Sequence, residues 1–260
     1  MIGMENSNYL SFLRPSQEAL ILYRDQVELD HILFEHVKSG LQQEDKAIYV
    51  AGTRSTSEVQ TALYSCGIDV DDQTRKRNLI ILTYDDLCLV NGVLDIQTIH
   101  DRLSSITKRI TKDYPNRSVR LVTESDWWLL ADVFEKAMEI EETHPRLPPN
   151  ISSICTYRLR DLLDYARIYH LAKLIELHRH ALWVSSLEGP IMHRNRLLSD
   201  INGVILSSIR ELELPINNDV SKTNIELHSP SDIVSHIKDQ NEVAELESII
   251  ERKLRRILDV

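Results

Sequence analysis

Glycine, proline and cysteine are all scarce in this 260-residue sequence, which has 7, 8 and 3 of them respectively. The three cysteines, Cys66, Cys88 and Cys155, show no CxxC spacing, which argues against a disulfide framework and a thiolate zinc site. No apolar run approaches the roughly 18–20 residues that a membrane helix needs, and the N-terminus has no signal-peptide pattern. We therefore expect a cytoplasmic protein that makes no contact with a membrane.

Basic charge is also in short supply, because 40 acidic residues against 30 basic ones give a formal net charge of −10 at pH 7. Phosphates repel an acidic surface, so direct nucleic-acid binding is disfavoured. The ten histidines show no metal-ligand pattern. His31 and His36 miss the spacing of three or four that puts ligands on one helix face, and His178 and His180 have no acidic or cysteine partner nearby. The sequence therefore predicts neither a metal nor a cofactor.

Short apolar runs alternate with amphipathic stretches over the first 190 residues, in a chain that is 42% hydrophobic. Runs of this length are typical of strands buried on both faces, and they lie at Ala19–Tyr23, Ala47–Ala51, Leu79–Thr83, Val119–Val122, Ile151–Tyr157 and Ala181–Ser185. Apolar residues at helical spacing predict helices between them, at Val27–Leu41, Ser57–Cys66, Asp95–Tyr114 and Trp127–Glu142. The alternation predicts an α/β fold with a mostly parallel sheet and helices on both faces.

The pattern changes to helices after Gly189–Pro190, so we divide the chain into an N-terminal extension (residues 1–14), an α/β domain (15–190) and a helical extension (191–260). The extension carries predicted helices at Asn195–Leu214 and Ser231–Leu258, with a loop over residues 215–230. The second helix has an apolar seam of about two heptads, formed by Val243, Leu246, Ile250, Leu254 and Ile257. We favour a homodimer across this seam, and packing of the seam onto the same subunit is the alternative.

A phosphate-binding loop is missing from the place where an α/β nucleotide-binding protein would carry one. Such a loop needs glycines, a lysine and a Ser or Thr, whereas only Arg24-Asp25-Gln26 separates the first strand from the first helix. No GxxxxGK[ST] occurs elsewhere, and no GxSxG elbow is present. We therefore expect no ATP hydrolysis by the usual route and no enzymatic activity.

Candidate site residues follow from the rule that parallel α/β sheets bind ligands beyond the carboxyl ends of their strands. The candidates for ligand binding are Tyr23, Arg24, Asp25, Glu124, Trp127, Tyr157 and Arg158. Several have simpler interpretations. The segment from Glu124 to Trp127 is either a polar wall with an apolar face or a helix N-terminus capped by Ser125 or Asp126. Arg158 either holds an anion or pairs with Asp161 or Asp164.

Simpler interpretations also exist for the residues at the end of the first strand. Arg24 either binds an anion near the helix N-terminus or is a solvated turn residue. We interpret Tyr23 as a half-buried strand residue with a wet hydroxyl.

The order of segments carries a family resemblance. Ala19–Tyr23, the helix ending Ser39-Gly40-Leu41, the strand Lys46–Val50, the turn Cys66–Val70 and the strand Asn78–Leu82 resemble the opening of KaiC/RecA-like ATPases. Val122–Trp127 resembles a "V-x-E-x-x-W" segment, Cys155-Thr156-Tyr157-Arg158 a "C-x-Y" strand and His178–Val184 a closing strand of the DcmR-like sensory domain (MEDS). That family is similar to a KaiC relative that lost its nucleotide loop. The resemblance covers roughly residues 15–190, with Glu18 where the family commonly carries a histidine.

The resemblance implies a non-catalytic protein of sensing and signal transduction. Its RecA-like domain, which lacks a phosphate-binding loop, would bind a small ligand or a protein partner, and the helical extension would pass the signal on. Two alternatives stay open: a transcription regulator acting through a DNA-binding partner, and an atypical nucleotide-binding ATPase. The sequence names neither the ligand nor the downstream partner.

Overall fold

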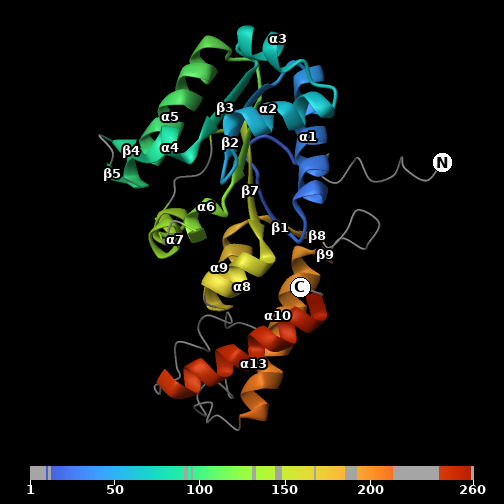
Figure 1. Ribbon diagram of the computed structural model, residues 1–260, viewed down its shortest axis with the longest axis vertical. Helices are drawn as coiled ribbons and strands as arrows, with labels where there is room; N and C mark the ends of the chain where they lie inside the picture. Colours follow the sequence, from blue (N-terminus) through green and yellow to red (C-terminus); the bar gives the residue numbers. More distant parts are fainter. Residues whose placement is uncertain are drawn as a thin grey trace, which may run out of the picture.

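A seven-stranded sheet lies at the centre of the computed structural model, which describes residues 10, 13–90, 93–94, 96–130, 133–143, 148–166, 168–184, 192–212 and 240–258. Its strand order is β3-β2-β6-β7-β1-β8-β9 (Figure 1). The strands are β1 (Glu18–Tyr23), β2 (Lys46–Ala51), β3 (Leu79–Thr83), β6 (Val119–Glu124), β7 (Ile151–Arg158), β8 (His180–Val184) and β9 (Met192–His193). All are parallel except β9, which pairs antiparallel with β8. The predicted α/β fold is confirmed.

Helices connect the strands and extend the chain beyond the sheet. They are α1 (Gln26–Gln42), α2 (Thr56–Ser65), α3 (Val70–Arg75), α4 (Tyr84–Cys88), α5 (Ile96–Asp113), α6 (Trp127–Leu130), α7 (Phe134–Thr143), α8 (Leu159–Tyr165), α9 (Ile168–Leu177), α10 (Arg194–Glu211) and α13 (Gln240–Leu258). A short antiparallel pair, β4 (Leu89–Val90) and β5 (Val93–Leu94), lies apart from the main sheet. None of the described helices is both long and apolar enough to cross a membrane.

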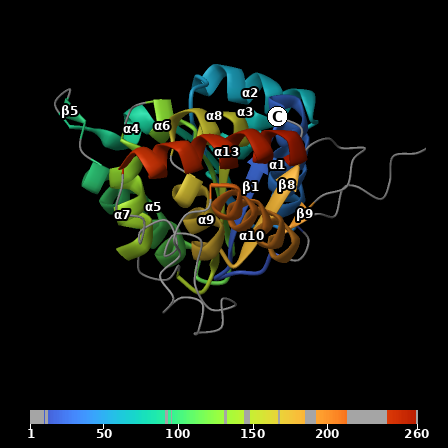
Figure 2. The same ribbon diagram turned by 90° about the horizontal axis from the view of Figure 1, so that it is seen from below.

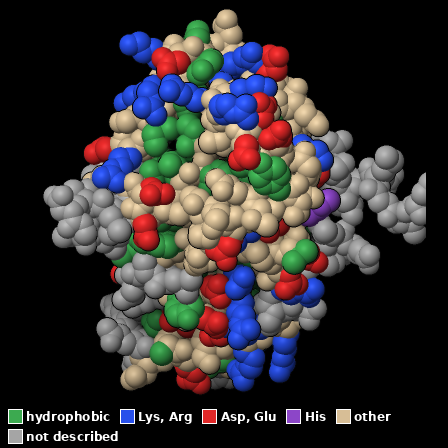
Figure 3. Space-filling view, turned by 45° about the horizontal axis from the view of Figure 1, so that its top comes forward, with side chains coloured by type: hydrophobic (Ala, Val, Ile, Leu, Met, Phe, Trp, Pro, Cys, Tyr) green, Lys and Arg blue, Asp and Glu red, His purple; other side chains and the backbone are tan. Residues whose placement is uncertain are grey.

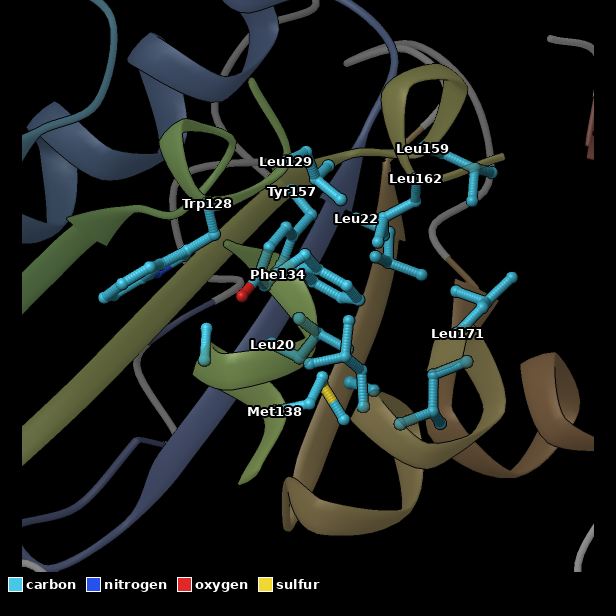
Figure 4. Close-up of a cluster of buried hydrophobic side chains, with 14 of the residues drawn as sticks. Leu20, Leu22, Trp128, Leu129, Phe134, Met138, Tyr157, Leu159, Leu162 and Leu171 are labelled. Atoms are coloured by element: carbon cyan, nitrogen blue, oxygen red, sulfur yellow. The ribbon is translucent and has the colours of Figure 1, made fainter. Parts of the chain in front are cut away.

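Each face of the sheet has its own hydrophobic core. In β1, Leu20 and Leu22 face a cluster that includes α7, α8 and α9, whereas Ala19, Ile21 and Tyr23 face a cluster that includes α1, α2 and α3. This alternation is the period of two expected of a strand, and both faces are apolar because both are covered by helices. Figure 4 shows the first cluster, with Leu20, Leu22 and Phe134 side by side.

The strand order creates two switch points at the carboxyl edge of the sheet. From β1 the chain crosses to β2 on one side, whereas from β7 it crosses to β8 on the other side. Right-handed crossovers place these two connections on opposite faces, so the carboxyl ends of β1 and β7 form a switch point, the kind of position at which such sheets bind ligands. The second switch point lies between β2 and β6, because β2 connects outward to β3 whereas β6 connects in the opposite direction to β7.

The predicted helix Trp127–Glu142 is wrong in one respect, because the chain forms two helices, α6 and α7, in its place. The break follows Leu130, and the backbone N–H of Val133 donates to the carbonyl of Trp128 just after it. Parts of other predictions lie outside the described residues: the ends at Asp95 and Ser185, the Gly189–Pro190 boundary, the loop 215–230, residues 231–239 and most of 1–14.

The two C-terminal helices pack on the rest of the same chain. Figure 1 shows α13 crossing α10, and the view from below in Figure 2 shows the two helices side by side. Helix α13 also contacts α9, and its Arg255 forms an ion pair of 2.5 Å with Asp164 of α8.

Within the apolar seam of α13, Leu246, Ile250 and Leu254 are fully buried in the cluster that covers one face of the sheet, and Val243 packs partly against it. Only Ile257 stays half exposed, at 50%. The predicted dimer seam is thus buried within the same chain. A homodimer stays a prediction, and it would have to form through a different surface.

Two isoleucines of α13 test this arrangement. Ile250→Ala should lower the free energy of unfolding by about 2–4 kcal/mol, because it empties a buried site. Ile257→Ala, the same change on the same helix, removes a half-exposed side chain and should cost less than about 1 kcal/mol. Urea denaturation measures both, and equal losses would contradict the packing of α13 described above.

Candidate functional site

The centre of the carboxyl edge is a buried ion pair between Arg54 and Glu124. Glu124 ends β6, and Arg54 lies in the loop that leads from β2 to α2. The Glu124 side chain is 5% exposed, and its carboxylate accepts hydrogen bonds from Arg54, from the Tyr49 hydroxyl at 2.6 Å and from the Gly52 N–H at 2.9 Å. A buried carboxylate needs such partners, because the loss of water would otherwise cost several kcal/mol.

Arg54 joins three elements of the edge. Its Nη1 donates to Asp30 of α1 at 2.8 Å, and its Nη2 donates to the Tyr49 hydroxyl at 3.0 Å as well as to Glu124. Asp30 also accepts a hydrogen bond of 2.9 Å from Gln26. Burial works against the charged guanidinium, but the hydrogen bond to Glu124 and the charges around it outweigh this effect and raise the pKa of Arg54. The arginine is therefore held as a cation by the protein's own acids.

Gly52 is the residue that lets the loop come close enough for this pairing. A Cβ at this position would lie 2.6 Å from the carbonyl oxygen of Glu124 and 2.9 Å from its Cβ. No side chain fits into that space without moving backbone atoms, so glycine is required by the close approach of the loop to β6.

A second polar cluster lies at the other switch point, between β1 and β7. The Tyr23 hydroxyl donates to one oxygen of Asp126, and the backbone N–H of Arg158 donates to the other at 2.5 Å. Tyr23 and Arg158 are paired in register on adjacent strands, and the Arg158 guanidinium lies 5.7 Å from the centre of the Tyr23 ring. Asp126 thus bridges the two strands with its carboxylate.

Burial sets the protonation of this cluster. It raises the pKa of Asp126 to about 6, although the hydrogen bonds from Tyr23 and from the Arg158 N–H oppose the rise. Burial also raises the pKa of Tyr23, and the negative charge of Asp126 adds to that effect. Tyr23 is 2% exposed with a bonded hydroxyl, so the interpretation as a half-buried residue with a wet hydroxyl is wrong.

The structure places the predicted site residues in three environments. Tyr23, Glu124 and Arg158 join the two polar clusters. Arg24 and Asp25 lie at the surface of the turn after β1 and pair with each other at 3.1 Å, with 36% and 58% of their side chains exposed.

The two aromatic candidates lie away from the charged groups. The Trp127 ring stacks on Tyr84, with 5.1 Å between centroids and 14° between planes. Tyr157 belongs to the hydrophobic core instead of the rim, because its ring is 1% exposed and packs edge-on against Phe134 at 5.8 Å (Figure 4).

Sequence reasoning missed several residues of this edge, chiefly Arg54, Tyr49 and Asp30, and it left Asp126 as part of a polar wall or as a helix cap, outside the candidate site residues. A signal existed for Arg54, because one of only seven glycines follows a buried strand and precedes it by two residues. Asp30 gave no such signal, since it lies within the regular helix α1. Within the described residues no group of three or more His, Cys, Asp or Glu is placed to hold a metal ion.

Fold and site together define an α/β domain with a parallel sheet whose carboxyl edge is filled by the protein's own polar contacts. The family model described as MEDS, the MEthanogen/methylotroph, DcmR Sensory domain, matches residues 19–179. This match covers more than half of the chain, so the protein belongs to the MEDS family, as the sequence resemblance indicates. The comparison with curated proteins found no match.

Solved structures share the fold at low sequence identity. An uncharacterized protein of Pyrococcus horikoshii, PH0321, solved in complex with an unknown peptide, has a TM-score of 0.50 and 14% identity, with 73% of this chain and 86% of that chain covered. Protein PH0250 of the same organism has a TM-score of 0.49 and 13% identity, covering 74% and 92%. The KaiC-like protein PH0186 has a TM-score of 0.46 and 12% identity, covering 71% and 81%.

The buried ion pair predicts a large cost for removing one partner. Arg54→Ala should lower the free energy of unfolding by about 3–5 kcal/mol, because Glu124 stays buried without its cation. The double variant Arg54→Met with Glu124→Gln should lose less than the two single changes together. Arg24→Ala is the control, since an exposed pair contributes about 1 kcal/mol or less. Urea denaturation of these variants, including the single changes Arg54→Met and Glu124→Gln, checks the prediction, and additive single losses would contradict the coupling.

Asp126 predicts a pH dependence of stability. Its pKa rises from 3.8 to about 6 on folding, so between these values the folded chain binds more protons than the unfolded one. Its contribution to stability is therefore lost as the pH rises from about 4 to about 6. Asp126→Asn has no carboxyl group at this position and so lacks this pH-dependent contribution. The free energy of unfolding of the variant, minus that of wild type, should therefore rise by up to about 3 kcal/mol as the pH increases across this range. Urea denaturation at several pH values measures the difference, and a flat or falling curve would contradict the raised pKa.

Proposed function

We propose that this chain is a non-catalytic sensory protein that binds a small ligand at the carboxyl edge of its sheet and passes the signal to another protein. Membership of the MEDS family, whose description names a sensory domain, indicates a sensory or signalling role. The ion pair between Arg54 and Glu124 is the observation that carries the non-catalytic part of the proposal. An acid after a central strand is a common metal ligand in nucleotide hydrolysis, and here that acid is already neutralised by a side chain of the same protein.

The turn between β1 and α1 supports the same conclusion. Arg24, Asp25 and Gln26 supply no glycine and no lysine, and Asp25 places an exposed carboxylate where a triphosphate would have to lie. Successive backbone N–H groups turned toward phosphates normally require glycines. The turn therefore disfavours a nucleotide on electrostatic and on conformational grounds.

Arg158 is a group at the edge that is available to a ligand. Among the described residues its guanidinium pairs with Asp161 at 3.8 Å, which is too long for a hydrogen bond, and lies 5.7 Å from the centre of the Tyr23 ring. Its Nε is buried and has no hydrogen-bond partner among the described residues, and 39% of the side chain is exposed. An unsatisfied buried donor costs about 1–3 kcal/mol, which an incoming acceptor would recover. We infer that the ligand carries a carboxylate or another oxyanion.

The signal follows from the way the edge is tied together. Asp126 links β1, β6 and β7, while Arg54 links α1, β2 and β6. A ligand that draws Arg158 toward itself changes the geometry of the residues bonded to Asp126. A ligand need only bind one arrangement better than another to shift the population, without any chemical step.

Native mass spectrometry of the protein purified from its own cells tests the proposal. We expect a retained small molecule on wild type that is lost in Arg158→Gln and kept in Arg160→Gln. Arg160 is the matched control, because it lies two residues away on α8, is 72% exposed and pairs with Asp164. Absence of a retained molecule, or equal retention by the two variants, would contradict ligand binding at Arg158.

Isothermal titration with ATP and magnesium tests the non-catalytic part. We expect no heat of binding and no release of phosphate, since the acid at the edge is occupied by Arg54. Micromolar binding of ATP, with hydrolysis that is abolished in Glu124→Gln, would support the ATPase alternative and contradict the proposed non-catalytic sensory function.

A further inference from the structure

A groove of about 590 Å³ lies between α10 and α13, and none of its lining residues belongs to the two polar clusters of the carboxyl edge. On α10 its lining residues recur at three- and four-residue steps from Arg196 to Ser207, which are the steps of one helix face. The twelve residues from Arg196 to Ser207 span about 16 Å of helix, so the groove runs along about three turns of α10. Lys253, Arg256 and Ile257 of α13 form its other side.

The floor of the groove is defined here as Gly203, Val204 and Ile257, and Ser199 and Ser207 line the groove beside them. A Cβ added to Gly203 would meet no atom within 4 Å, so space lies directly above this residue. Val204 and Ile257 line the same groove, and half of the Ile257 side chain is exposed. Together these two residues can contact an apolar side chain of a bound partner, and that contact would remove the Ile257 side chain from water.

The rim of the groove is basic. Arg196, Lys253 and Arg256 line it together with one carboxylate, that of Asp200, which lies 3.8 Å from Arg196. Lys253 is fixed by Glu211 at 2.7 Å and by the Ser207 hydroxyl at 3.2 Å. Arg256 is exposed and forms no ion pair with another described residue. Figure 3 shows Lys and Arg side chains gathered in the lower part of the molecule, where Figure 1 places α10 and α13.

We propose that the groove between α10 and α13 binds an acidic amphipathic helix of a signalling partner. A groove between two helices with an apolar floor fits the apolar face of a third helix, read at steps of three, four and seven residues. The basic rim then faces the acidic residues of that helix. The assignment of the partner to signalling rests on the proposed function, but the binding itself does not.

A nucleic acid fits the groove less well. Phosphates would gain nothing from Val204 and Ile257, and Asp200 inside the groove and the net charge of −10 would repel them. The groove also lies outside residues 19–179, which match the MEDS family, and α10 contacts β8, the strand next to β1. The groove therefore lies outside the part of the chain that matches the MEDS family, and one of the helices that line it contacts the sheet that carries the polar edge.

A defined peptide tests the proposal on the full chain. The probe is a fluorescein-labelled amphipathic helix with leucines along one face and glutamates on the other, and a peptide with lysines in place of the glutamates is its control. In fluorescence anisotropy at physiological salt we expect the glutamate peptide to bind and the lysine peptide not to bind. Failure of the glutamate peptide to bind would overturn the proposal, whatever the outcome at Arg158.

Three variants show whether the peptide occupies this groove. Gly203→Leu fills the space above Gly203 and should weaken binding by at least about tenfold, while its urea midpoint stays equal or rises because leucine favours a helix. Arg256→Glu should weaken binding by about tenfold through charge repulsion. Arg252→Glu makes the same change at an exposed residue of α13 outside the groove and should change the affinity less than about threefold.

Two results would reject the assignment. Equal binding by wild type and Gly203→Leu would place the peptide elsewhere on the surface. Loss of self-association in Gly203→Leu, measured by light scattering of the chain alone, would make a second copy of this protein the occupant instead of a signalling partner.

Discussion

The carboxyl edge of this protein depends on one electrostatic constraint, the burial of the Glu124 carboxylate at the end of β6. A buried carboxylate must be paired, and Arg54, Tyr49 and the Gly52 N–H satisfy it together. This requirement fixes the path of the loop after β2, demands glycine at position 52 and draws α1 in through Asp30. The positive charge at this edge is thus supplied by a side chain, so the edge keeps its shape without a bound ligand.

The strands could be predicted from the sequence because their burial on both faces leaves a plain apolar run. The polar contacts between these strands could not be predicted in the same way. Arg54 and Glu124 are 70 residues apart, and Tyr23 and Asp126 are 103 apart, so their contacts follow from the strand order and not from local spacing. The candidates that proved polar and clustered, Tyr23, Glu124 and Arg158, were found because they end strands. Tyr157 is the residue before the last one of β7, and the alternation of the strand turns its ring into the core.

The C-terminal helices show a different limit. A seam of Leu246, Ile250 and Leu254 must be covered, but the same heptad spacing serves a partner helix in the same chain or in a second copy. The structure covers it with α9 and α10. The groove between α10 and α13 lies outside this seam, and there Gly203 and Ile257 lie among basic residues.

The parallel sheet has a consequence for how this protein is made. The polar edge needs β1, β2, β6 and β7, and a growing chain has placed Tyr23 and Arg54 long before Arg158 is synthesised. Contacts between such distant segments form late and slowly, because each requires the closure of a long loop. Asp126 gains its second hydrogen-bond donor, the backbone N–H of Arg158, only after β7 has been synthesised. A nascent or truncated domain that ends before Arg158 therefore leaves one oxygen of Asp126 without its backbone donor, and the polar edge is complete only in the finished fold.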